Sequence, residues 1–288
     1  MKDAITLHNV NKAFNGFALN NVSFSVKKGF ITGFIGPNGS GKTTTIKLIM
    51  NIIRQDSGTL RLFGLDNEEY SKEVKQRIGF VYAENHFYEH LTVEKMKQVI
   101  APFYTQWDDG VFAYYMDYFN LPWRKKIKHL STGMVTKLSL AMALSHHAEL
   151  IIMDEPTSGL DPIVRREILD ILSEVIQDEN KAIFFSTHIT TDLEQIADYI
   201  TFLYNGEIIF SDRKDMIKEQ YYIVKGANEL LDADIRTMFI QLRETSTGFE
   251  GLTVEPKKVR TMMGDYVVME SALLEDIMVY TARKDQYV

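Results

Sequence analysis

The sequence predicts an α/β protein with a largely parallel central sheet in three layers, followed by a small α+β appendage. A glycine-rich loop at residues 36–43 lies between an apolar strand and a helix with apolar spacing. Two further apolar runs, residues 149–155 and 182–188, end in carboxylate and imidazole side chains and have a helical segment between them. Strands that alternate with helices in this way indicate a mostly parallel sheet covered by helices.

The glycine-rich loop is the most specific feature. Residues 36–43, GPNGSGKT, fit the phosphate-binding pattern GxxxxGK[ST] without a mismatch. Glycines let the backbone approach a phosphate, and the N–H groups at the start of the following helix point at the anion. We expect Lys42 to reach the terminal phosphates and Thr43 to bind magnesium, so the chain binds a nucleoside triphosphate. The residues expected to contact it here are Gly36, Pro37, Asn38, Gly39, Ser40, Gly41, Lys42, Thr43 and Thr44.

The composition is that of an ordinary globular protein. The chain has 288 residues, is 45% apolar and carries a formal net charge of −7, so we expect no nucleic-acid partner. No cysteine is present, which excludes disulfides and thiolate metal sites. The start lacks the regions of a signal peptide, and no apolar run reaches the roughly 18 residues of a membrane span. The protein is expected to be cytosolic or held to a membrane by a partner.

Two strands are predicted before the loop, because apolar residues alternate at residues 4–10 and 22–26. The turn between them, residues 12–16, carries Phe14. An aromatic ring in this place is suited to stacking on a purine base, although an isolated Phe is more often part of a core. Both interpretations of Phe14 stay open from these residues alone.

Beyond the loop, strands and helices alternate. Short strands are predicted at residues 58–64 and 78–82. A mostly helical lobe, dense in aromatic residues, follows from Thr92, whose hydroxyl is expected to cap its first helix, to about Ser145. Another helix is predicted at residues 162–179, between the two apolar strands that end in polar side chains.

The C-terminal part follows a hairpin whose strands, residues 199–204 and 207–210, are joined by Asn205-Gly206. From about Ser211 the chain carries no phosphate-binding motif and is predicted to be a small α+β unit. Its expected elements are a strand at 221–224, a helix at 228–242, strands near 249–254 and 265–269, and a final helix from Ala272 capped by Ser271.

Four more segments accompany the phosphate loop in order along the chain. They are Leu130-Ser131-Thr132-Gly133-Met134, Asp154-Glu155-Pro156, Ser158-Gly159-Leu160-Asp161 and Ser186-Thr187-His188. Together with GPNGSGKTT, they resemble the ATP-binding cassette of ABC transporters over about residues 5–210. The resemblance implies a P-loop three-layer cassette with an antiparallel β subdomain and a helical subdomain, and ATP and Mg²⁺ as cofactors. We expect the nucleotide-binding domain at residues 1–212, its helical subdomain at about 86–146, and the appendage at 213–288.

On the family's pattern the motifs carry roles in ATP hydrolysis. Asp154 closes the Walker B strand and helps to hold Mg²⁺, and Glu155 polarises the attacking water. His188 is the switch histidine that contacts the γ-phosphate, Asp161 lies in the D-loop, and Phe14 is the ring that stacks on adenine. These roles suit phosphoryl transfer, which needs charge neutralisation and an aligned water. The expected catalytic residues are Lys42, Glu155 and His188, and the expected metal ligands are Thr43 and Asp154.

The resemblance also implies that one chain holds half of a composite site. In the family, Ser131 and Gly133 of the signature segment touch the γ-phosphate bound by the partner's loop, so that two cassettes close head to tail over two ATP molecules. The signature here is LSTGM rather than LSGGQ, with Thr132 and Met134 as the changed residues. Since Ser131 and Gly133 are retained, we expect the phosphate contact to be retained, in a homodimer or a heterodimer.

A second departure lies at the Q-loop. Ala83 stands where the family commonly has a glutamine that reaches the magnesium and the water. Either Glu84 or Asn85 takes over this contact, or the contact is absent and turnover is slow.

The LSxGM signature and the ending at residues 273–280 resemble the ATPase subunits of ABC-2 type exporters of Gram-positive bacteria. These include subfamilies linked to antimicrobial-peptide resistance and to export of amphipathic peptides such as phenol-soluble modulins. We expect a separate membrane subunit whose coupling helix docks near Phe87, Tyr88 and Phe103. The chain would then be peripheral, at the cytoplasmic face of the cell membrane.

Two other functions stay open. A soluble ABC ATPase acting on ribosomes or DNA is disfavoured, because such members carry two cassettes, long coiled coils or zinc cysteines, and this sequence has none of these. A nucleotide-sensing module that does not hydrolyse ATP is motivated by the missing Q-loop glutamine, but Glu155 argues against it.

Overall fold

The computed structural model describes residues 3–82 and 86–283 of the chain. Strands of the N-terminal part are β1 (Asp3–Phe14), β2 (Phe17–Lys27), β3 (Ile31–Ile35), β4 (Ser57–Leu62), β5 (Leu65–Asp66), β6 (Ile78–Val81), β7 (Leu150–Asp154), β8 (Ala182–Thr187), β9 (Tyr199–Tyr204) and β10 (Glu207–Arg213). Its helices are α1 (Lys42–Ile49), α2 (Ser71–Gln76), α3 (Val93–Ile100), α4 (Asp109–Tyr118), α5 (Thr132–Leu144), α6 (Pro162–Val175) and α7 (Thr190–Ile196).

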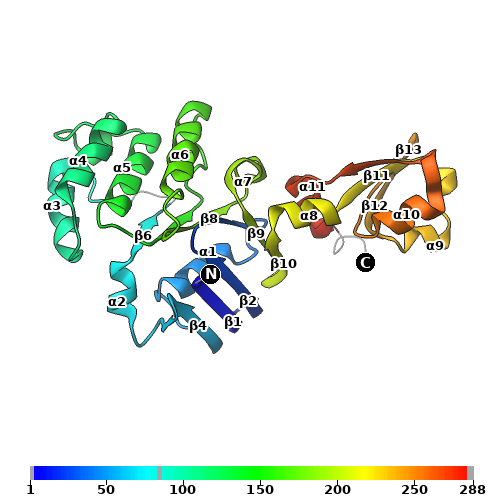
Figure 1. Cartoon of the computed structure of the whole chain (residues 1–288), viewed down its shortest axis with the longest axis horizontal. Coiled ribbons are helices and arrows are strands. Elements are labelled where there is room, and N and C mark those ends of the chain that lie inside the picture. Colours follow the sequence, from blue (N-terminus) through cyan, green and yellow to red (C-terminus); the bar gives the residue numbers. More distant parts are fainter. Residues whose placement is uncertain (1–2, 83–85, 284–288) are drawn as a thin grey trace.

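A six-stranded sheet forms the centre of this part, in the order β10-β9-β3-β8-β7-β6 (Figure 1). Its neighbouring strands are parallel except β9 and β10, which form the hairpin predicted from the sequence. Ile152 and Phe184 face the core on one side of the sheet, whereas Ile151 and Phe185 face the core on the other. The strands are therefore buried on both faces, as their continuous apolar runs predict.

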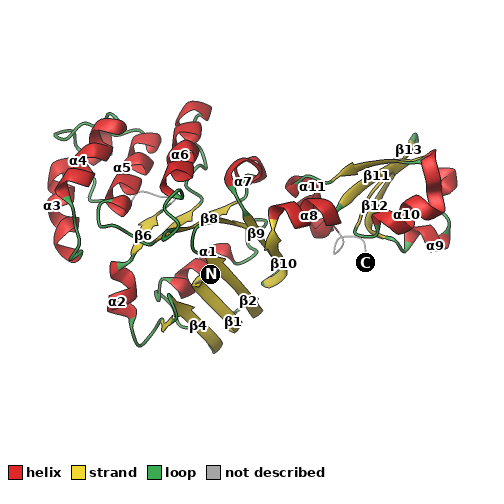
Figure 2. Cartoon of the chain, viewed as in Figure 1, coloured by secondary structure: helices red, strands yellow, loops and turns green. Residues whose placement is uncertain are grey.

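The two faces of the central sheet are covered differently. An antiparallel sheet in the order β2-β1-β4-β5 covers one face together with α1 (Figure 2). Phe24, Phe34 and Phe184 fill this interface, with ring centroids 5.1 to 5.7 Å apart. Helices α6 and α7 cover the other face with buried Ile168 and Leu193. The predicted three-layer cassette is confirmed.

Helices α3, α4 and α5 form the helical lobe beyond β6, at the left of Figure 1. Phe112 on α4 is fully buried, and the rings of Trp107 and Trp123 pack against it at centroid distances of 5.5 and 5.4 Å. The Thr92 hydroxyl accepts a hydrogen bond from the backbone N–H of Lys95. The predicted cap of α3 is therefore confirmed.

The appendage contains a second antiparallel unit. Ile235 and Val259 pack on one face of its sheet against Val224 and Phe249, and the last helix lies between the other face and the cassette (Figure 1). Its sheet has the order β12-β13-β11-β14. Its elements are α8 (Lys214–Gln220), β11 (Tyr222–Gly226), α9 (Ala233–Arg236), β12 (Phe239–Thr245), β13 (Gly248–Thr253), α10 (Pro256–Met263), β14 (Val268–Ser271) and α11 (Leu274–Arg283). The proposed division after residue 212 falls one residue before the end of β10 and stays a prediction.

Helix α11 ties the appendage to the cassette. The Tyr204 hydroxyl on β9 donates to the Ala282 carbonyl at 3.0 Å, and the backbone N–H of Leu274 donates to Glu194 on α7 at 3.0 Å. Glu194 also pairs with Lys218 of α8 at 2.6 Å. The appendage is thus hydrogen-bonded to β9, which ends at the phosphate-loop edge of the sheet, and to α7, which starts at that edge.

The helix predicted at residues 228–242 is wrong. Within this stretch α9 occupies only Ala233–Arg236, and β12 occupies Phe239–Thr245. Asp232 starts α9 by accepting a hydrogen bond from the backbone N–H of Ile235 at 2.8 Å. Strand β12 then pairs along β13 in a hairpin, and this pairing overrides the helical spacing of the apolar residues.

The start of the final helix was also predicted wrongly. Helix α11 begins at Leu274 rather than Ala272, because Ser271 ends β14 and its hydroxyl donates to a carbonyl of α8. The Asp276 carboxylate accepts from the backbone N–H of Leu273 at 3.0 Å instead. Helix α10 was not predicted.

An ion-pair cluster closes the end of the central sheet opposite the phosphate loop. Glu149, just before β7, accepts two hydrogen bonds from Arg77 at 2.6 and 3.0 Å and one from Lys28 at 2.5 Å. The hydrogen bonds from Arg77, followed by the contact with Lys28, lower the pKa of Glu149 to about 2. The cluster joins the segments that lead into β3, β6 and β7.

This cluster predicts a pH-dependent contribution to stability. Because the pKa of Glu149 is lower in the folded state, its contribution is present above pH 4.5 and is lost as the pH falls towards about 2. Glu149→Gln should therefore lower the melting temperature at pH 7. The difference in melting temperature between the variant and wild type should shrink as the pH falls from 4.5 to about 2. Thermal unfolding followed by circular dichroism measures this. The control is Glu207→Gln, an exposed carboxylate with no ion pair in the described part of the chain. A difference that stays constant with pH would contradict the assignment.

Candidate active site

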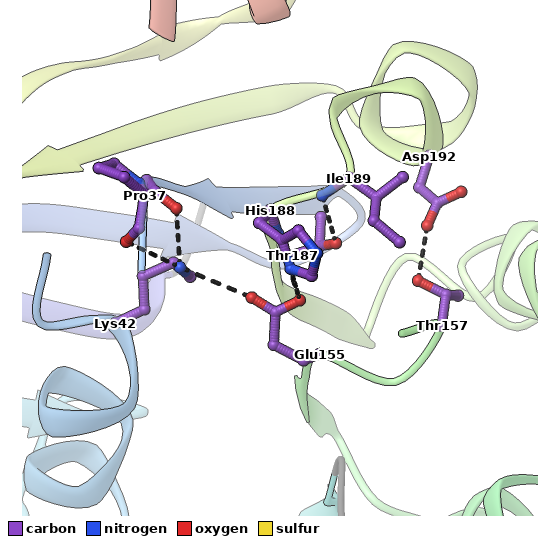
Figure 3. A network of polar contacts seen from close by, with 9 residues as sticks. Pro37, Lys42, Glu155, Thr157, Thr187, His188, Ile189 and Asp192 are labelled. Carbon is purple, nitrogen blue, oxygen red and sulfur yellow. Dashed lines mark hydrogen bonds and ion pairs between the residues drawn. The ribbon is translucent and has the colours of Figure 1, made fainter. Parts of the chain in front are cut away.

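Parallel strand pairing brings three motifs to one edge of the sheet. Ile35 at the end of β3 pairs with Thr187 of β8, and Asp154 at the end of β7 pairs with Ser186. The phosphate loop follows β3 directly, Glu155 follows β7, and His188 follows β8. The carboxyl ends of parallel strands are where α/β proteins place their ligands, and Figure 3 shows the three segments converging.

The backbone of the phosphate loop depends on glycine at two positions. A Cβ on Gly36 would lie 2.2 Å from the Leu203 carbonyl oxygen, and Gly41 has φ of +109° with the Phe17 ring 2.7 Å from the position of its Cβ. No side chain caps α1, so the first N–H groups of this eight-residue helix remain for an anion. The loop has the geometry that the motif predicts for phosphate binding.

Lys42 lies in the cavity with little exposure to solvent. Its Nζ donates to the carbonyl oxygens of Gly36 at 2.7 Å and Pro37 at 3.3 Å, and lies 3.6 Å from Glu155 Oε1 (Figure 3). Burial lowers the pKa of Lys42, and the Glu155 carboxylate opposes that shift. The carboxylate therefore helps to keep a cation at the phosphate loop.

Glu155 and His188 are in direct contact. Glu155 Oε2 lies 2.6 Å from His188 Nδ1 and accepts the backbone N–H of His188 at 3.2 Å. Glu155 has φ of +51°, a conformation that non-glycine residues seldom adopt, and its own N–H donates to the Ser186 carbonyl at 2.9 Å. The turn after β7 thus aims the carboxylate at both Lys42 and His188.

Asp154 and Thr43 suit a magnesium ion. Burial raises the pKa of Asp154, and its Oδ1 is buried without a hydrogen-bond partner among the described atoms. Thr43 lines the cavity in front of it. No group of three or more His, Cys, Asp or Glu that could hold a metal occurs in residues 3–82 and 86–283. Asp154 and Thr43 fit Mg²⁺, which uses one or two carboxylates together with phosphate oxygens and water.

The cavity between these motifs has a volume of about 530 Å³. It is lined by Phe17, Asn38, Gly39, Gly41, Lys42, Thr43, Thr44, Glu155, Ser158 and His188. Three predicted contact residues of the loop, Gly36, Pro37 and Ser40, do not line it, and Gly36 and Ser40 are buried. Ser158 was not among the predicted site residues.

Phe17 lines the cavity and Phe14 does not. Phe17 packs against Gly41, whereas Phe14 at the end of β1 is 46% exposed, with Lys12 Nζ 5.7 Å from its ring centroid. The sequence offered a signal for Phe17, because alternation along β2 puts it on the same face as buried Leu19. The assignment of adenine stacking to Phe14 stays a prediction.

The signature and D-loop residues lie outside the cavity of their own chain. Ser131 is exposed and caps α5 by accepting from the backbone N–H of Met134 at 3.3 Å. Gly133 is buried, and a Cβ there would lie 2.8 Å from the Val164 side chain of α6. Asp161 is exposed and caps α6. The structure therefore separates these three residues from Lys42, Glu155 and His188.

The Q-loop prediction concerns Ala83, Glu84 and Asn85. These residues lie outside the described part of the chain.

Comparisons with known proteins agree with the motif order. A family model described as "ABC transporter" matches residues 19–158. The ABC transporter ATP-binding protein YtrB of Bacillus subtilis is 32% identical over 232 residues, which cover 80% of this chain and 78% of YtrB. The chain belongs to the ABC transporter ATP-binding family. As a member of this family it is an ATPase that binds ATP and drives transport.

A second relative and a solved structure are also similar to this chain. The bacitracin transport ATP-binding protein BcrA of Bacillus licheniformis is 32% identical over 205 residues, 70% of this chain and 67% of BcrA. The dimeric structure of MJ0796, a bacterial ABC transporter cassette, is 24% identical with a TM-score of 0.64 and covers 73% of this chain and 98% of that one. At that identity the likeness supports the fold. In the described part of this ABC subunit, the helices are too short or too polar to cross a membrane.

The position of Phe17 gives a test of base binding. Phe17→Ala should weaken ATP binding by roughly threefold to tenfold, the range expected for loss of one aromatic contact. Phe14→Ala is the matched variant, because it removes an exposed ring at the end of the neighbouring strand β1. Titration with a fluorescent ATP analogue measures both affinities. A larger loss for Phe14→Ala would show that the family's stacking position carries the contact instead.

Proposed function

We propose that this ABC subunit hydrolyses ATP with Glu155, His188 and Lys42 and drives a separate membrane subunit of an exporter. The observation that carries the proposal is the contact of Glu155 with both Lys42 and His188, beside the phosphate loop. Glu155 supplies the acceptor that aligns and deprotonates the attacking water. Its contact with Nδ1 makes that nitrogen the proton donor of the imidazole and orients the ring.

Lys42 and the helix-end amides neutralise the phosphates, and Thr43 and Asp154 would hold Mg²⁺. Bound Mg²⁺ supplies further charge neutralisation on the β- and γ-phosphates. The unpartnered Asp154 Oδ1 supports this assignment, because a buried carboxylate oxygen requires a partner. Gly36, Pro37 and Ser40 shape the loop behind the phosphates rather than contact them through side chains.

The second ATPase subunit completes the site. Ser131 and Thr132 are exposed at the start of α5 and lie outside the chain's own cavity, so they are free to contact a nucleotide on another subunit. Asp161 is exposed at the start of α6. The head-to-tail dimer implied by the family, and the dimeric state named for MJ0796, support this arrangement.

The membrane subunit would dock on the helical lobe. A groove of about 340 Å³ there includes Phe87 and Phe103, and the nearby Tyr88 is 57% exposed and Phe103 72% exposed. Exposed aromatic residues around an apolar groove are typical of a docking surface for a helix. This partner would hold the chain at the cytoplasmic face of the membrane. The exported substrate class, peptides or amphipathic compounds, is supported by the resemblance to ABC-2 exporters and by the name of BcrA, a bacitracin transport ATP-binding protein.

Hydrolysis by Glu155 is tested by Glu155→Gln. The amide keeps the size of the side chain but accepts no proton at neutral pH, so Mg²⁺-dependent phosphate release should fall by about 10²-fold or more. ATP binding should be retained, because the phosphate loop is unchanged. Steady-state phosphate release measures the turnover, and titration with ATP measures the affinity. Glu207→Gln, at an exposed carboxylate, is the control. Equal turnover of Glu155→Gln and wild type would show that Glu155 does not activate the attacking water.

A further inference from the structure

The segments that carry Glu155 and His188 are joined a second time, away from the cavity. The Thr157 hydroxyl, two residues after Glu155, donates to Asp192 Oδ2 at 2.6 Å (Figure 3). Asp192 lies in the first turn of α7, four residues after His188. Both side chains are 1% exposed, so this hydrogen bond is shielded from water.

Helix α6 also contacts the Asp192 carboxylate. Arg165 pairs through Nε with Asp192 Oδ1, and its Nη2 donates to the Thr191 hydroxyl at 2.6 Å. A buried carboxylate without such partners would be costly, so Arg165 makes the position of Asp192 tenable. Asp192 therefore ties α7 to the turn after Glu155 and to α6.

The His188 side chain has few other restraints. It is 44% exposed, and besides the contacts with Glu155 the turn that presents it has two local hydrogen bonds among the described residues. The Ile189 N–H donates to the Thr187 hydroxyl at 2.9 Å, and the Asp192 N–H donates to the Ile189 carbonyl at 3.2 Å. Within residues 3–82 and 86–283, no side chain caps α7. The register of β7 and β8 and the contacts of Glu155 with His188 set the position of this turn, and the hydrogen bond between Asp192 and Thr157 adds a further restraint at the start of the helix.

We propose that Asp192 is a positioning residue for ATP hydrolysis, which holds the His188 turn against Glu155 through its hydrogen bond with Thr157. The proposal rests on the catalytic roles proposed for Glu155 and His188. Neither Thr157 nor Asp192 lines the cavity, so the hydrogen bond acts on the chemical step rather than on nucleotide binding. A small displacement of a catalytic group is enough to slow a reaction strongly.

The test uses the full-length chain with Thr157→Val and Thr157→Ser. Thr157→Val keeps the volume and removes the hydroxyl, and should lower kcat for ATP by about tenfold while changing KM by less than about twofold. Thr157→Ser keeps the hydroxyl and should recover kcat to within about twofold of wild type. The control is Thr253→Val, which removes a buried hydroxyl donated to Met238 in the appendage and should leave kcat unchanged.

A second variant tests the positioning role of Asp192 if Thr157→Val does not fold. Asp192→Asn keeps the size of the side chain but loses the charge that holds Arg165, and should lower kcat in the same way without raising KM. If kcat is unchanged in the folded variants of Thr157 and Asp192 while Glu155→Gln is inactive, the positioning role is wrong and the proposed function stands. Equal losses in Thr157→Val and Thr157→Ser would also overturn it. Turnover retained by Glu155→Gln would instead refute the proposed function itself.

Discussion

The site depends above all on the parallel register of β3, β7 and β8. Because Ile35 pairs with Thr187 and Asp154 pairs with Ser186, three loops that are far apart in the chain start from the same edge. Buried Phe and Ile side chains lie on both faces of these strands. A shift of the register by one residue would turn each of them to the opposite face of the sheet, so the packing strongly favours the observed register. The contacts among Lys42, Glu155 and His188 are thus set by the core.

The phosphate loop is also supported from behind by the hairpin of β9 and β10. The Gly206 N–H donates to the Ser40 carbonyl at 3.1 Å, and the Leu203 carbonyl lies where a side chain on Gly36 would be. The same hairpin carries Tyr204, which donates to the last helix of the appendage. The appendage is therefore part of the support of the nucleotide site, through β9 on one side and α7 on the other.

How much the sequence predicts differs between the site and the appendage. Lys42, Glu155 and His188 could be named because short motifs encode local turns at strand ends, and the α/β pattern brings such ends together. Phe17 was missed because it lies before the alternation predicted at residues 22–26, although β2 starts at Phe17, and no motif encodes its packing against Gly41. The helix at residues 228–242 failed because β12 is defined by a partner strand rather than by its own spacing. Asp192 carried no motif at all, since its contacts to Thr157 and Arg165 come from other segments.

In the proposed mechanism, Lys42, Glu155 and His188 form half of an ATP site that a second subunit completes. A crystal structure of the full-length Glu155→Gln variant with Mg²⁺ and ATP tests it most directly. We expect a head-to-tail dimer in which the γ-phosphate lies between Lys42 of one subunit and Ser131 of the other, with His188 in contact with that phosphate. An ATP-bound monomer, or a dimer in which Ser131 faces solvent, would contradict it.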